Sequence, residues 1–263
     1  MLEFPNINPV ALDLGVIKIR WYALSYIVGI LLSWFLILKI IKIKKIDLNS
    51  KEISDLVSNC MIGIIIGGRL GYVFFYNPEY YSNNLLEIFK IWNGGMSFHG
   101  GFIGVIFAVI YSSKLFKIPI LTFADLIAIV APVGLFFGRL ANFINGELFG
   151  RTTNHSFGII FPNGGDLPRH PSQLYEAFFE GIVLFIILWV MMYIFDLLKK
   201  PGIITSLFIF LYGLFRFFIE FFREPDQHIG LLYFEFSMGQ ILSFPMILIG
   251  LYFSIIFYNK GKY

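Results

Sequence analysis

The first residues with chemical potential lie in the stretch GRLANFINGELFGR, residues 138–151. Arg139 and Asn142 are three positions apart and share one face of a predicted helix, and Asn145 and Glu147 follow where that helix meets water. A guanidinium presents a planar fork of donors that matches phosphate oxygens, and amides add neutral donors. The stretch therefore predicts a phosphate clamp, although an ordinary capped helix end explains Asn145 equally well.

A second polar group lies in YGLFRFFIEFFREPD, residues 212–226. Tyr212, Arg216, Glu220 and Arg223 recur at spacings of four, four and three, which places them on one stripe of a helix and its end. A structural ion pair between Arg216 and Glu220 is an alternative to a role in binding. Even as a structural pair, the two side chains must face protein or water instead of lipid.

A third candidate is His99, which lies between two glycine pairs in WNGGMSFHGGFIGV, residues 92–105. Histidine is the side chain best able to take up a proton near neutral pH, and glycines permit a close approach of backbone to a ligand or to another helix. The stretch is also compatible with a simpler structure, in which the glycines pack helices together and His99 lies at a membrane interface.

The composition shows what must position these residues. Of 263 residues, 57% are hydrophobic and 14% are charged, with a mean hydropathy of +0.77, whereas an average soluble domain has about 25% charged residues. Repeated apolar runs of about 20 residues can each cross a bilayer as a helix. We therefore expect an all-α polytopic membrane protein that forms one transmembrane domain over residues 1–263. The seven predicted spans are 20–41, 55–76, 96–113, 121–143, 174–197, 202–222 and 237–258.

The distribution of lysine predicts the direction of the spans. Most lysines lie in alternate connecting segments, and lysine-rich loops face the cytoplasm. The amino terminus is then outside and the carboxyl terminus inside. The longest loop, at 144–173, becomes a small extracytoplasmic cap between the fourth and fifth spans. The lysines that set this topology are Lys39, Lys42, Lys44, Lys45, Lys51, Lys114, Lys117, Lys199, Lys200, Lys260 and Lys262.

The arginines follow a different pattern, because none lies in the lysine-rich loops. Arg69, Arg139 and Arg216 each lie in the second half of an outward-running span, at the depth of the outer leaflet. The inward-running spans begin near Tyr22, His99 and Glu176, at the same level. Arginines near helix ends can simply extend to the interface. Several at one depth, joined by polar partners, instead favour an outward-facing cavity that binds an anion.

The single cysteine and the other histidines indicate no further catalytic or metal site. Cys60 is the only cysteine and lies in an apolar run, VSNCMIGIII, where a buried bystander is more typical than a nucleophile. His155, His170 and His228 are isolated, and they lack the spacing of a zinc site. We expect no metal, no nucleotide or redox cofactor and no nucleic-acid partner.

Four motifs, in this order, resemble the bacterial prolipoprotein diacylglyceryl transferase family. They are GGMSFHGGFIGV, GRLANFINGELFG, RHPSQLYE and YGLFRFFIEFFREPD, and the likeness extends to RWYALSYIVG and SMGQILSFPM. The resemblance implies a seven-span enzyme of the bacterial plasma membrane. Such an enzyme moves the diacylglyceryl group of phosphatidylglycerol to the lipobox cysteine of a prolipoprotein, so that a thioether forms and glycerol phosphate leaves.

The resemblance also implies roles for individual residues. Arg139 matches the family's lipid-phosphate-binding arginine. Other functional positions of the family match His99, Asn142, Glu147, Tyr22, Tyr212, Arg216 and Glu220. We hypothesise that His99 takes the thiol proton, that Arg139 and Arg216 hold the leaving phosphate, and that Arg69, Glu220 and Arg223 orient this group. We expect the enzyme to work as a monomer, with its active site in the outer-leaflet half.

Two other functions compete with this interpretation. A transporter of an anionic solute or lipid would also line a cavity with polar residues, but it should have polar access from both sides, and the inner halves of the predicted spans are almost entirely apolar. The inner half of the fourth span contains only Asp125 as a charged residue. A non-catalytic membrane scaffold would explain the aromatic surface but not the converging arginines.

Overall fold

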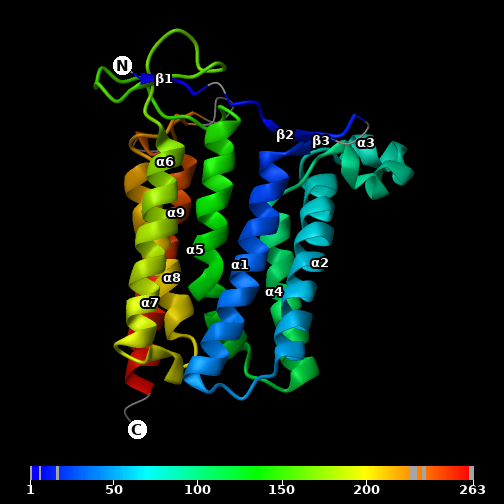
Figure 1. The fold of residues 1–263 in the computed structure, drawn as a ribbon, viewed down its shortest axis with the longest axis vertical. Helices are drawn as coiled ribbons and strands as arrows, with labels where there is room; N and C mark the ends of the chain where they lie inside the picture. The colour runs from blue at the N-terminus through cyan, green and yellow to red at the C-terminus, as the bar shows by residue number, and fades with distance from the viewer. Residues whose placement is uncertain (1, 6, 16–17, 226–229, 233–234, 261–263) are drawn as a thin grey trace. The chain divides into compact units, whose positions relative to one another are not determined.

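The computed structural model describes residues 2–5, 7–15, 18–225, 230–232 and 235–260. Within these ranges the chain is mainly helical (Figure 1). The helices are α1 (Trp21–Lys44), α2 (Ser50–Phe75), α3 (Pro78–Asn83), η1 (Leu85–Phe89), η2 (Ile91–Asn93), α4 (Phe98–Phe116), α5 (Ile120–Ile144), α6 (Ser172–Glu176), η3 (Ala177–Val183), α7 (Leu184–Tyr193), η4 (Leu197–Lys199), α8 (Ile203–Ile219) and α9 (Met238–Lys260). The strands are β1 (Leu2–Glu3), β2 (Val10–Asp13), β3 (Lys18–Arg20) and β4 (Ile159–Ile160).

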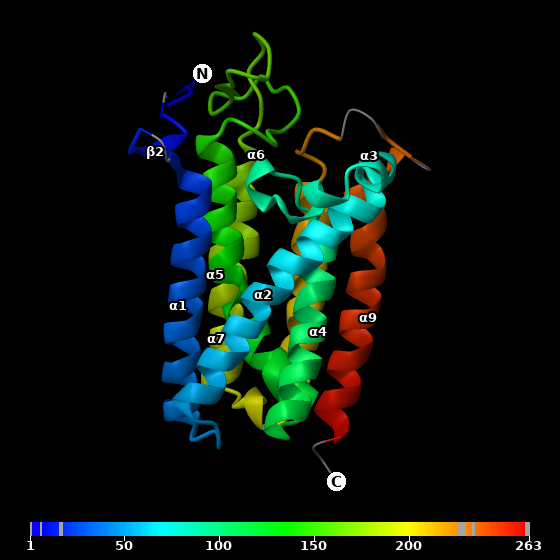
Figure 2. The ribbon, with the colours of Figure 1, turned by 90° about the vertical axis from the view of Figure 1, so that its right-hand side faces the viewer.

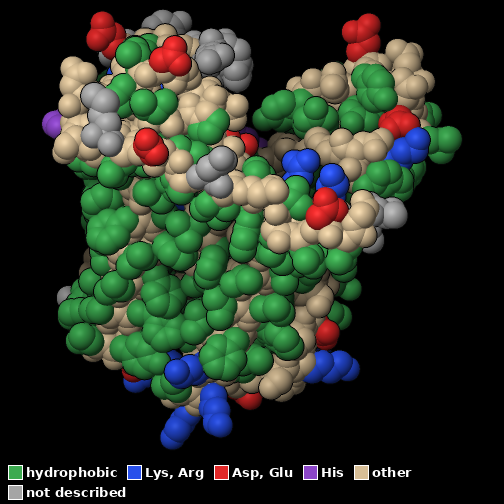
Figure 3. Space-filling model, turned by 45° about the horizontal axis from the view of Figure 1, so that its top comes forward, with side chains coloured by type: hydrophobic (Ala, Val, Ile, Leu, Met, Phe, Trp, Pro, Cys, Tyr) green, Lys and Arg blue, Asp and Glu red, His purple; other side chains and the backbone are tan. Residues whose placement is uncertain are grey.

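The described helices include six that are long and apolar enough to cross a membrane, and α8 is a shorter apolar helix. The span Ser172–Tyr193 combines α6, η3 and α7. Each predicted span coincides with one of these helices to within a few residues, so the predicted all-α polytopic membrane fold is confirmed. Hydrophobic side chains cover the sides of the helices in Figure 3, as expected for helices that face lipid.

The chain divides into two compact units. The first comprises Met1–Phe35 and Asp125–Tyr263, and the second comprises Leu36–Ala124. In the first unit, α8 packs along α9 and against α7. The approach of α8 to α9 is close because Gly250 has no side chain, and a Cβ at that position would collide with the backbone of Phe210.

Asp125 fixes the beginning of α8 in the first unit. Its Oδ2 accepts a hydrogen bond from the backbone N–H of Gly202 at 2.7 Å, and its Oδ1 accepts from both the N–H and the hydroxyl of Thr205 at 2.7 and 2.6 Å. The first N–H groups of a helix have no partner within the helix, so a buried carboxylate from another helix serves as their cap. The sole acid of α5 therefore has structural partners at the beginning of α8.

The fifth span contains a π-helical turn, η3, between α6 and α7. Gly181 lies in this turn, and a Cβ added there would be 2.7 Å from Cβ of Phe136 on α5. Wider turns of this kind change the direction of side chains along a helix and are frequent at functional sites. Glu176 ends α6 immediately before this turn, and Glu180 lies within it. The helical periodicity of the sequence does not predict this π-helical turn.

The second unit is built on the pairing of α2 with α4 (Figure 2). Gly63 and Gly67 of α2 face Gly104 and Gly100 of α4, and a Cβ at any of the four would overlap backbone atoms of the facing helix. Small residues let membrane helices approach closely enough for dispersion contacts to hold them together. For the glycines in residues 92–105, helix packing was one of two possible roles. The structure confirms it for Gly100.

Residues 145–171 connect α5 to α6 and contain β4. β1 pairs in parallel with β4, with Leu2 opposite Ile159, and β2 pairs in antiparallel fashion with β3. Phe4 packs its ring against Phe143 at 5.6 Å and Phe161 at 5.4 Å between centroids. These contacts attach the amino-terminal segment to the end of α5 and to the connection. The assignment of the connection as an extracytoplasmic cap stays a prediction.

Candidate functional site

Three helices of the first unit bring together an ion-pair cluster of arginines and glutamates. Arg139 comes from α5, Arg216 comes from α8, and Glu176 lies between them at the end of α6. Nε of Arg139 is 2.6 Å from Oε2 of Glu176, and Nη1 of Arg216 is 3.2 Å from Oε1 of the same carboxylate. The cluster consists of Arg139, Arg216, Arg223, Glu176, Glu180 and Glu220.

Glu176 is the centre of this ion-pair cluster. It is 0% exposed, and besides Arg139 and Arg216 it lies 3.8 Å from Nη1 of Arg223. Removing a carboxylate from water costs several kcal/mol unless cations and hydrogen bonds compensate. Three arginines around one carboxylate supply that compensation, and in return Glu176 fixes the direction of the Arg139 and Arg216 side chains.

Glu180 is equally buried but less well bound. Its carboxylate is 0% exposed. Its oxygens lie 3.7 Å from Nη2 of Arg139 and 3.8 Å from Nη1 of Arg216. Within the described part of the chain, neither oxygen accepts a hydrogen bond. With all six side chains ionised, three positive and three negative charges cancel in the cluster.

Glu220 and Arg223 complete the cluster. Oε1 of Glu220 is 2.5 Å from Nη2 of Arg216 and 3.7 Å from Nη1 of Arg223, and Oε2 accepts a hydrogen bond of 2.7 Å from the hydroxyl of Ser237. Gly239 leaves room for this carboxylate, because a Cβ there would lie 2.5 Å from its carboxyl carbon. The Arg216–Glu220 ion pair that the spacing suggested is present, and it is joined to the other members of the cluster.

The amides of the motif at 138–151 converge on Glu147. Nδ2 of Asn142 and Nδ2 of Asn145 donate to Oε1 of Glu147 at 2.9 and 3.1 Å. The backbone carbonyl of Glu147 accepts from Nε2 of Gln173 at 2.6 Å. The turn after α5 is therefore held by its own polar side chains and by the beginning of α6.

Two tyrosines of the first unit were also site candidates. Tyr22 lies in the first turn of α1, where its hydroxyl is 3.2 Å from that of Tyr26, and it interacts electrostatically with Glu147 and Arg139. Tyr212 lies on α8 one turn before Arg216 and interacts electrostatically with Arg139, Arg216, Glu176 and Glu180. Of the predicted stripe, Arg216, Glu220 and Arg223 belong to the ion-pair cluster, and Tyr212 lies beside it.

Arg69 belongs to the second unit and is buried there. Its guanidinium donates hydrogen bonds to backbone carbonyls in the segment after α3. It also lies over the ring of Tyr81, with 5.1 Å between Cζ of Arg69 and the ring centroid. Gly94 and Gly95 adopt positive φ values of 82° and 81°, which turns their carbonyls toward Arg69. The acceptors are the carbonyl oxygens of Ile88, Gly94, Gly95, Glu87 and Lys90.

His99 also belongs to the second unit, at the second position of α4. Its side chain is exposed and lies against the ring of Phe98, with 5.8 Å between centroids. The hydroxyl of Ser97 caps the helix by accepting from the N–H of Gly100. The N–H of Ser97 donates to the carbonyl of Gly68 at 2.8 Å, which attaches this helix beginning to α2 beside Arg69.

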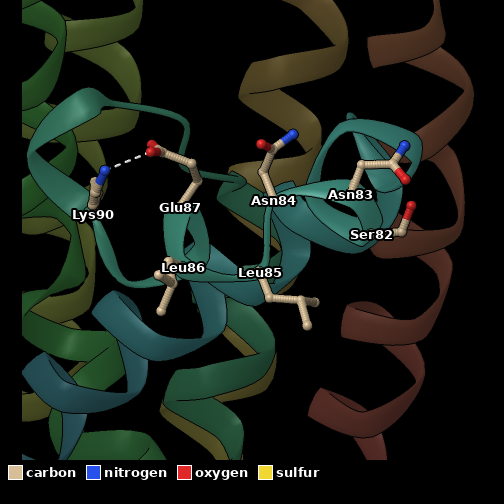
Figure 4. Close-up of a pocket in the computed structure, with 7 residues that line it drawn as sticks. All are labelled: Ser82, Asn83, Asn84, Leu85, Leu86, Glu87 and Lys90. Atoms are coloured by element: carbon tan, nitrogen blue, oxygen red, sulfur yellow. Dashed lines mark hydrogen bonds and ion pairs between the residues drawn. The ribbon is translucent and has the colours of Figure 1, made fainter.

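The same unit has a concave surface on the segment after α3 (Figure 4). Asn83, Asn84 and Glu87 point to one side of this segment, and Leu85 and Leu86 point to the other. Nζ of Lys90 donates to Glu87, and this hydrogen bond lowers the pKa of the half-buried Glu87 carboxyl. The segment is amphipathic, and its polar face does not repeat the arginine–glutamate arrangement of the first unit.

Two glutamates of the cluster were not assigned a role from the sequence. From the sequence, Glu176 is only a polar residue at a span beginning, and Glu180 has no predicted role. A signal was present, because Glu180 interrupts the apolar run FFEGIVLFIILWV, and an acid inside a membrane span carries a large insertion cost. Among the described residues, no group of three or more His, Cys, Asp or Glu side chains is arranged to hold a metal ion.

The fold and the cluster together define a polytopic helical membrane protein with a buried arginine–glutamate network in its first unit. Residues 9–256 match the model of the family described as prolipoprotein diacylglyceryl transferase, and the chain belongs to that family. The resemblance seen in the motifs is thereby confirmed.

Relatives in several Rickettsia species carry the name phosphatidylglycerol–prolipoprotein diacylglyceryl transferase. The chain is 53% identical to the protein of Rickettsia felis over 251 residues, which cover 95% of this chain and 97% of the relative. It is 54% identical to the protein of Rickettsia rickettsii strain Sheila Smith, with the same coverage. It is 52% identical to the protein of Rickettsia bellii strain OSU 85-389 over 254 residues, 97% of each chain.

Proposed function

We propose that this protein is a transferase that moves the diacylglyceryl group of phosphatidylglycerol to the lipobox cysteine of a prolipoprotein, the first step of bacterial lipoprotein maturation. The observation that carries the proposal is the convergence of Arg139 and Arg216 on Glu176, in a chain related over 95% of its length to proteins of that name. Two guanidiniums held side by side within a membrane protein suit an anionic lipid headgroup.

In the proposed reaction, the cysteine sulfur attacks the glycerol carbon that bears the phosphate ester. A C–S bond forms and the C–O bond breaks, so the oxygen leaves with the glycerol phosphate. The thiol proton passes to a base and then to the leaving phosphate or to water, and atoms and charges balance. Because a thiolate is the nucleophile and negative charge gathers on the departing phosphate, the reaction requires a base and fixed positive charge.

We propose that Arg139 and Arg216 provide that charge. Glu176 contacts Nε of Arg139 and Nη1 of Arg216, which leaves other N–H donors of both guanidiniums for phosphate oxygens. Preorganised donors need no reorientation as charge develops, and they are most effective where water is excluded. Glu220 and Arg223 support this arrangement through their own contacts with Arg216 and Glu176.

We propose that His99 is the general base. Its exposed position at the beginning of α4 leaves the imidazole accessible to an incoming thiol. Arg69 would act as a positioning residue, because its donors bind the carbonyls of the segment that precedes α4. Tyr22, Asn142, Asn145, Glu147 and Tyr212 are proposed to bind the remainder of the lipid headgroup.

The protein has several membrane-spanning helices, and we propose the plasma membrane of a bacterium as its location. The alternation of lysine-rich segments supports an external amino terminus, a cytoplasmic carboxyl terminus and an active site in the outer-leaflet half. Residues 144–173 would then cap the site from outside, where a lipobox segment approaches. We propose that a single copy of the 263-residue chain performs the transfer, as one transmembrane domain.

The test is a transfer assay with purified protein in detergent micelles. A lipobox peptide and phosphatidylglycerol are incubated with the protein, and the peptide mass is measured. We expect a mass increase equal to one diacylglyceryl group and the release of one glycerol phosphate per modified peptide. A peptide with serine in place of the lipobox cysteine is the control. Binding of the lipid with no mass increase in either peptide would contradict the proposal.

A further inference from the structure

We propose that Glu180 takes up a proton when an anionic phosphate headgroup binds between Arg139 and Arg216, so that headgroup binding is coupled to protonation of this buried carboxylate. The inference rests on the proposed function, because it assumes that the headgroup binds in the ion-pair cluster. It adds a positioning residue to that site and a dependence of lipid affinity on pH.

The three carboxylates of the cluster differ in how closely they are bound. Glu176 has a cation at 2.6 Å and another at 3.2 Å, and Glu220 has an arginine at 2.5 Å and a hydroxyl donor at 2.7 Å. Glu180 has its nearest cations at 3.7 and 3.8 Å. Within the described residues neither Glu176 nor Glu180 accepts a hydrogen bond, so the distance to the cations is what distinguishes these two carboxylates. Close cations and hydrogen bonds stabilise the charged form and burial disfavours it, so Glu180, with the most distant cations and no hydrogen bond, is the carboxylate that neutralises most readily.

The charge balance of the cluster also favours protonation of Glu180 when a headgroup binds. Three arginines face three glutamates in the cluster. A phosphate diester would add one negative charge and compete for the same guanidiniums, which leaves an excess of negative charge in a buried place. A like charge nearby disfavours the ionised carboxylate. Protonation of Glu180 removes this excess and releases Arg139 and Arg216 to the phosphate.

The surroundings of Glu180 leave few other acceptors for that proton. Arg139 faces it from α5, Tyr212 and Arg216 face it from α8, Arg223 interacts from beyond α8, and Glu176 lies one turn earlier in its own span. The arginines and the tyrosine are already protonated near neutral pH. Glu176 is the competing site, and it holds its charge through closer contacts with arginine nitrogens.

The test measures proton uptake directly. The purified protein in detergent is titrated calorimetrically with a short-chain phosphatidylglycerol, in buffers of different ionisation enthalpy, across the range from pH 5 to pH 9. We expect uptake of about one proton per lipid bound at some pH in that range, and around that pH the affinity should fall about tenfold per pH unit. The uncharged diacylglycerol is the control and should give no uptake.

Two variants test whether Glu180 is the residue that takes up the proton. Glu180→Gln should bind the lipid with an affinity that no longer depends on pH and should take up no proton, whereas Glu79→Gln, a change at an exposed acid of α3, should retain the uptake and the pH dependence. Lipid binding by the wild-type protein without proton uptake would overturn the inference even if the Glu180 variant failed to fold. The same uptake in wild type and Glu180→Gln would also overturn it.

These outcomes separate the inference from the proposed function. Lipid binding with proton uptake but no transfer to a lipobox peptide would remove the transferase proposal and leave the coupling intact. Transfer with no proton uptake would remove only the coupling. A protein that binds no phosphatidylglycerol at any pH would overturn both.

Discussion

Nε of Arg139 and Oε2 of Glu176 lie 2.6 Å apart, although 37 positions separate them in the chain. Glu176 also lies 3.2 Å from Arg216, so one buried carboxylate sets the directions of two cations from different helices. Because a guanidinium is a planar fork, its value for binding a phosphate depends on its direction as well as its charge. The contact between these two residues therefore leads to the first two predictions.

Replacement of Glu176 should destabilise the protein as well as its site. Glu176→Gln keeps the shape of the side chain but removes the charge that the arginines surround. Breaking one side of a buried ion pair costs about 3–5 kcal/mol, and we expect a decrease of this order in the free energy of unfolding, measured by denaturation in detergent. A matched change at an exposed acid, Glu79→Gln, should leave it unchanged. Equal stabilities of the two variants would show that the arginines do not depend on Glu176.

Arg139→Lys retains a positive charge but loses the planar fork of donors. We expect kcat/KM for transfer to fall about 100- to 1,000-fold, the range found when one preorganised donor to a developing oxyanion is lost. The protein should remain folded, as judged by its thermal unfolding. Arg20→Lys, at an exposed strand position, is the matched control. Full activity of the Arg139 variant would mean that simple charge attraction is sufficient.

His99→Gln tests the general base. The variant keeps a polar side chain that cannot accept the thiol proton, and we expect kcat to fall about 100- to 10,000-fold with little change in lipid affinity. His155→Gln, at a ring stacked on Phe157 at 5.1 Å, should leave kcat unchanged. Near-normal transfer by His99→Gln when chemistry limits the rate would exclude this role.

Asp125→Ala should affect stability and leave catalysis intact. The substitution leaves the N–H groups of Gly202 and Thr205 without their buried acceptor, and an unsatisfied buried donor costs about 1–3 kcal/mol. We expect the melting temperature in detergent to fall and the activity of the remaining folded protein to equal that of wild type. A loss of kcat in folded protein would point to a direct role of Asp125 in the site.

Gly67→Ala tests the packing of α2 on α4. A Cβ at Gly67 would overlap the carbonyl of Gly100, and forcing extra volume into packed helices costs about 1–3 kcal/mol. We expect a lower melting temperature. Gly134→Ala is the matched control, because no atom lies within 4 Å of the Cβ it would add. Alanine is more favourable than glycine in a helix by about 1 kcal/mol, so this variant should not lower the melting temperature. Equal melting temperatures of the two variants would contradict this account of the interface.

Some features follow from the sequence because they depend on neighbours along the chain. The membrane spans were predictable because crossing a bilayer requires about 20 apolar residues in succession. The stripe of Tyr212, Arg216, Glu220 and Arg223 was predictable because helical geometry alone places these spacings on one face. The lysine pattern predicts a direction for the spans on the same local basis, and that direction stays a prediction.

The tertiary structure decided the partners of each charge. No local rule indicates that Arg139 meets Glu176, or that Arg69 binds a set of loop carbonyls. Glu180 joins the arginines from a π-helical turn that helical periodicity does not predict. These features depend on contacts between segments far apart in the chain, since a buried charge is tolerated only where the whole fold supplies its compensation. The sequence by itself determined which side chains carry charge into the membrane, and only the packing of the helices determined which of them stand together.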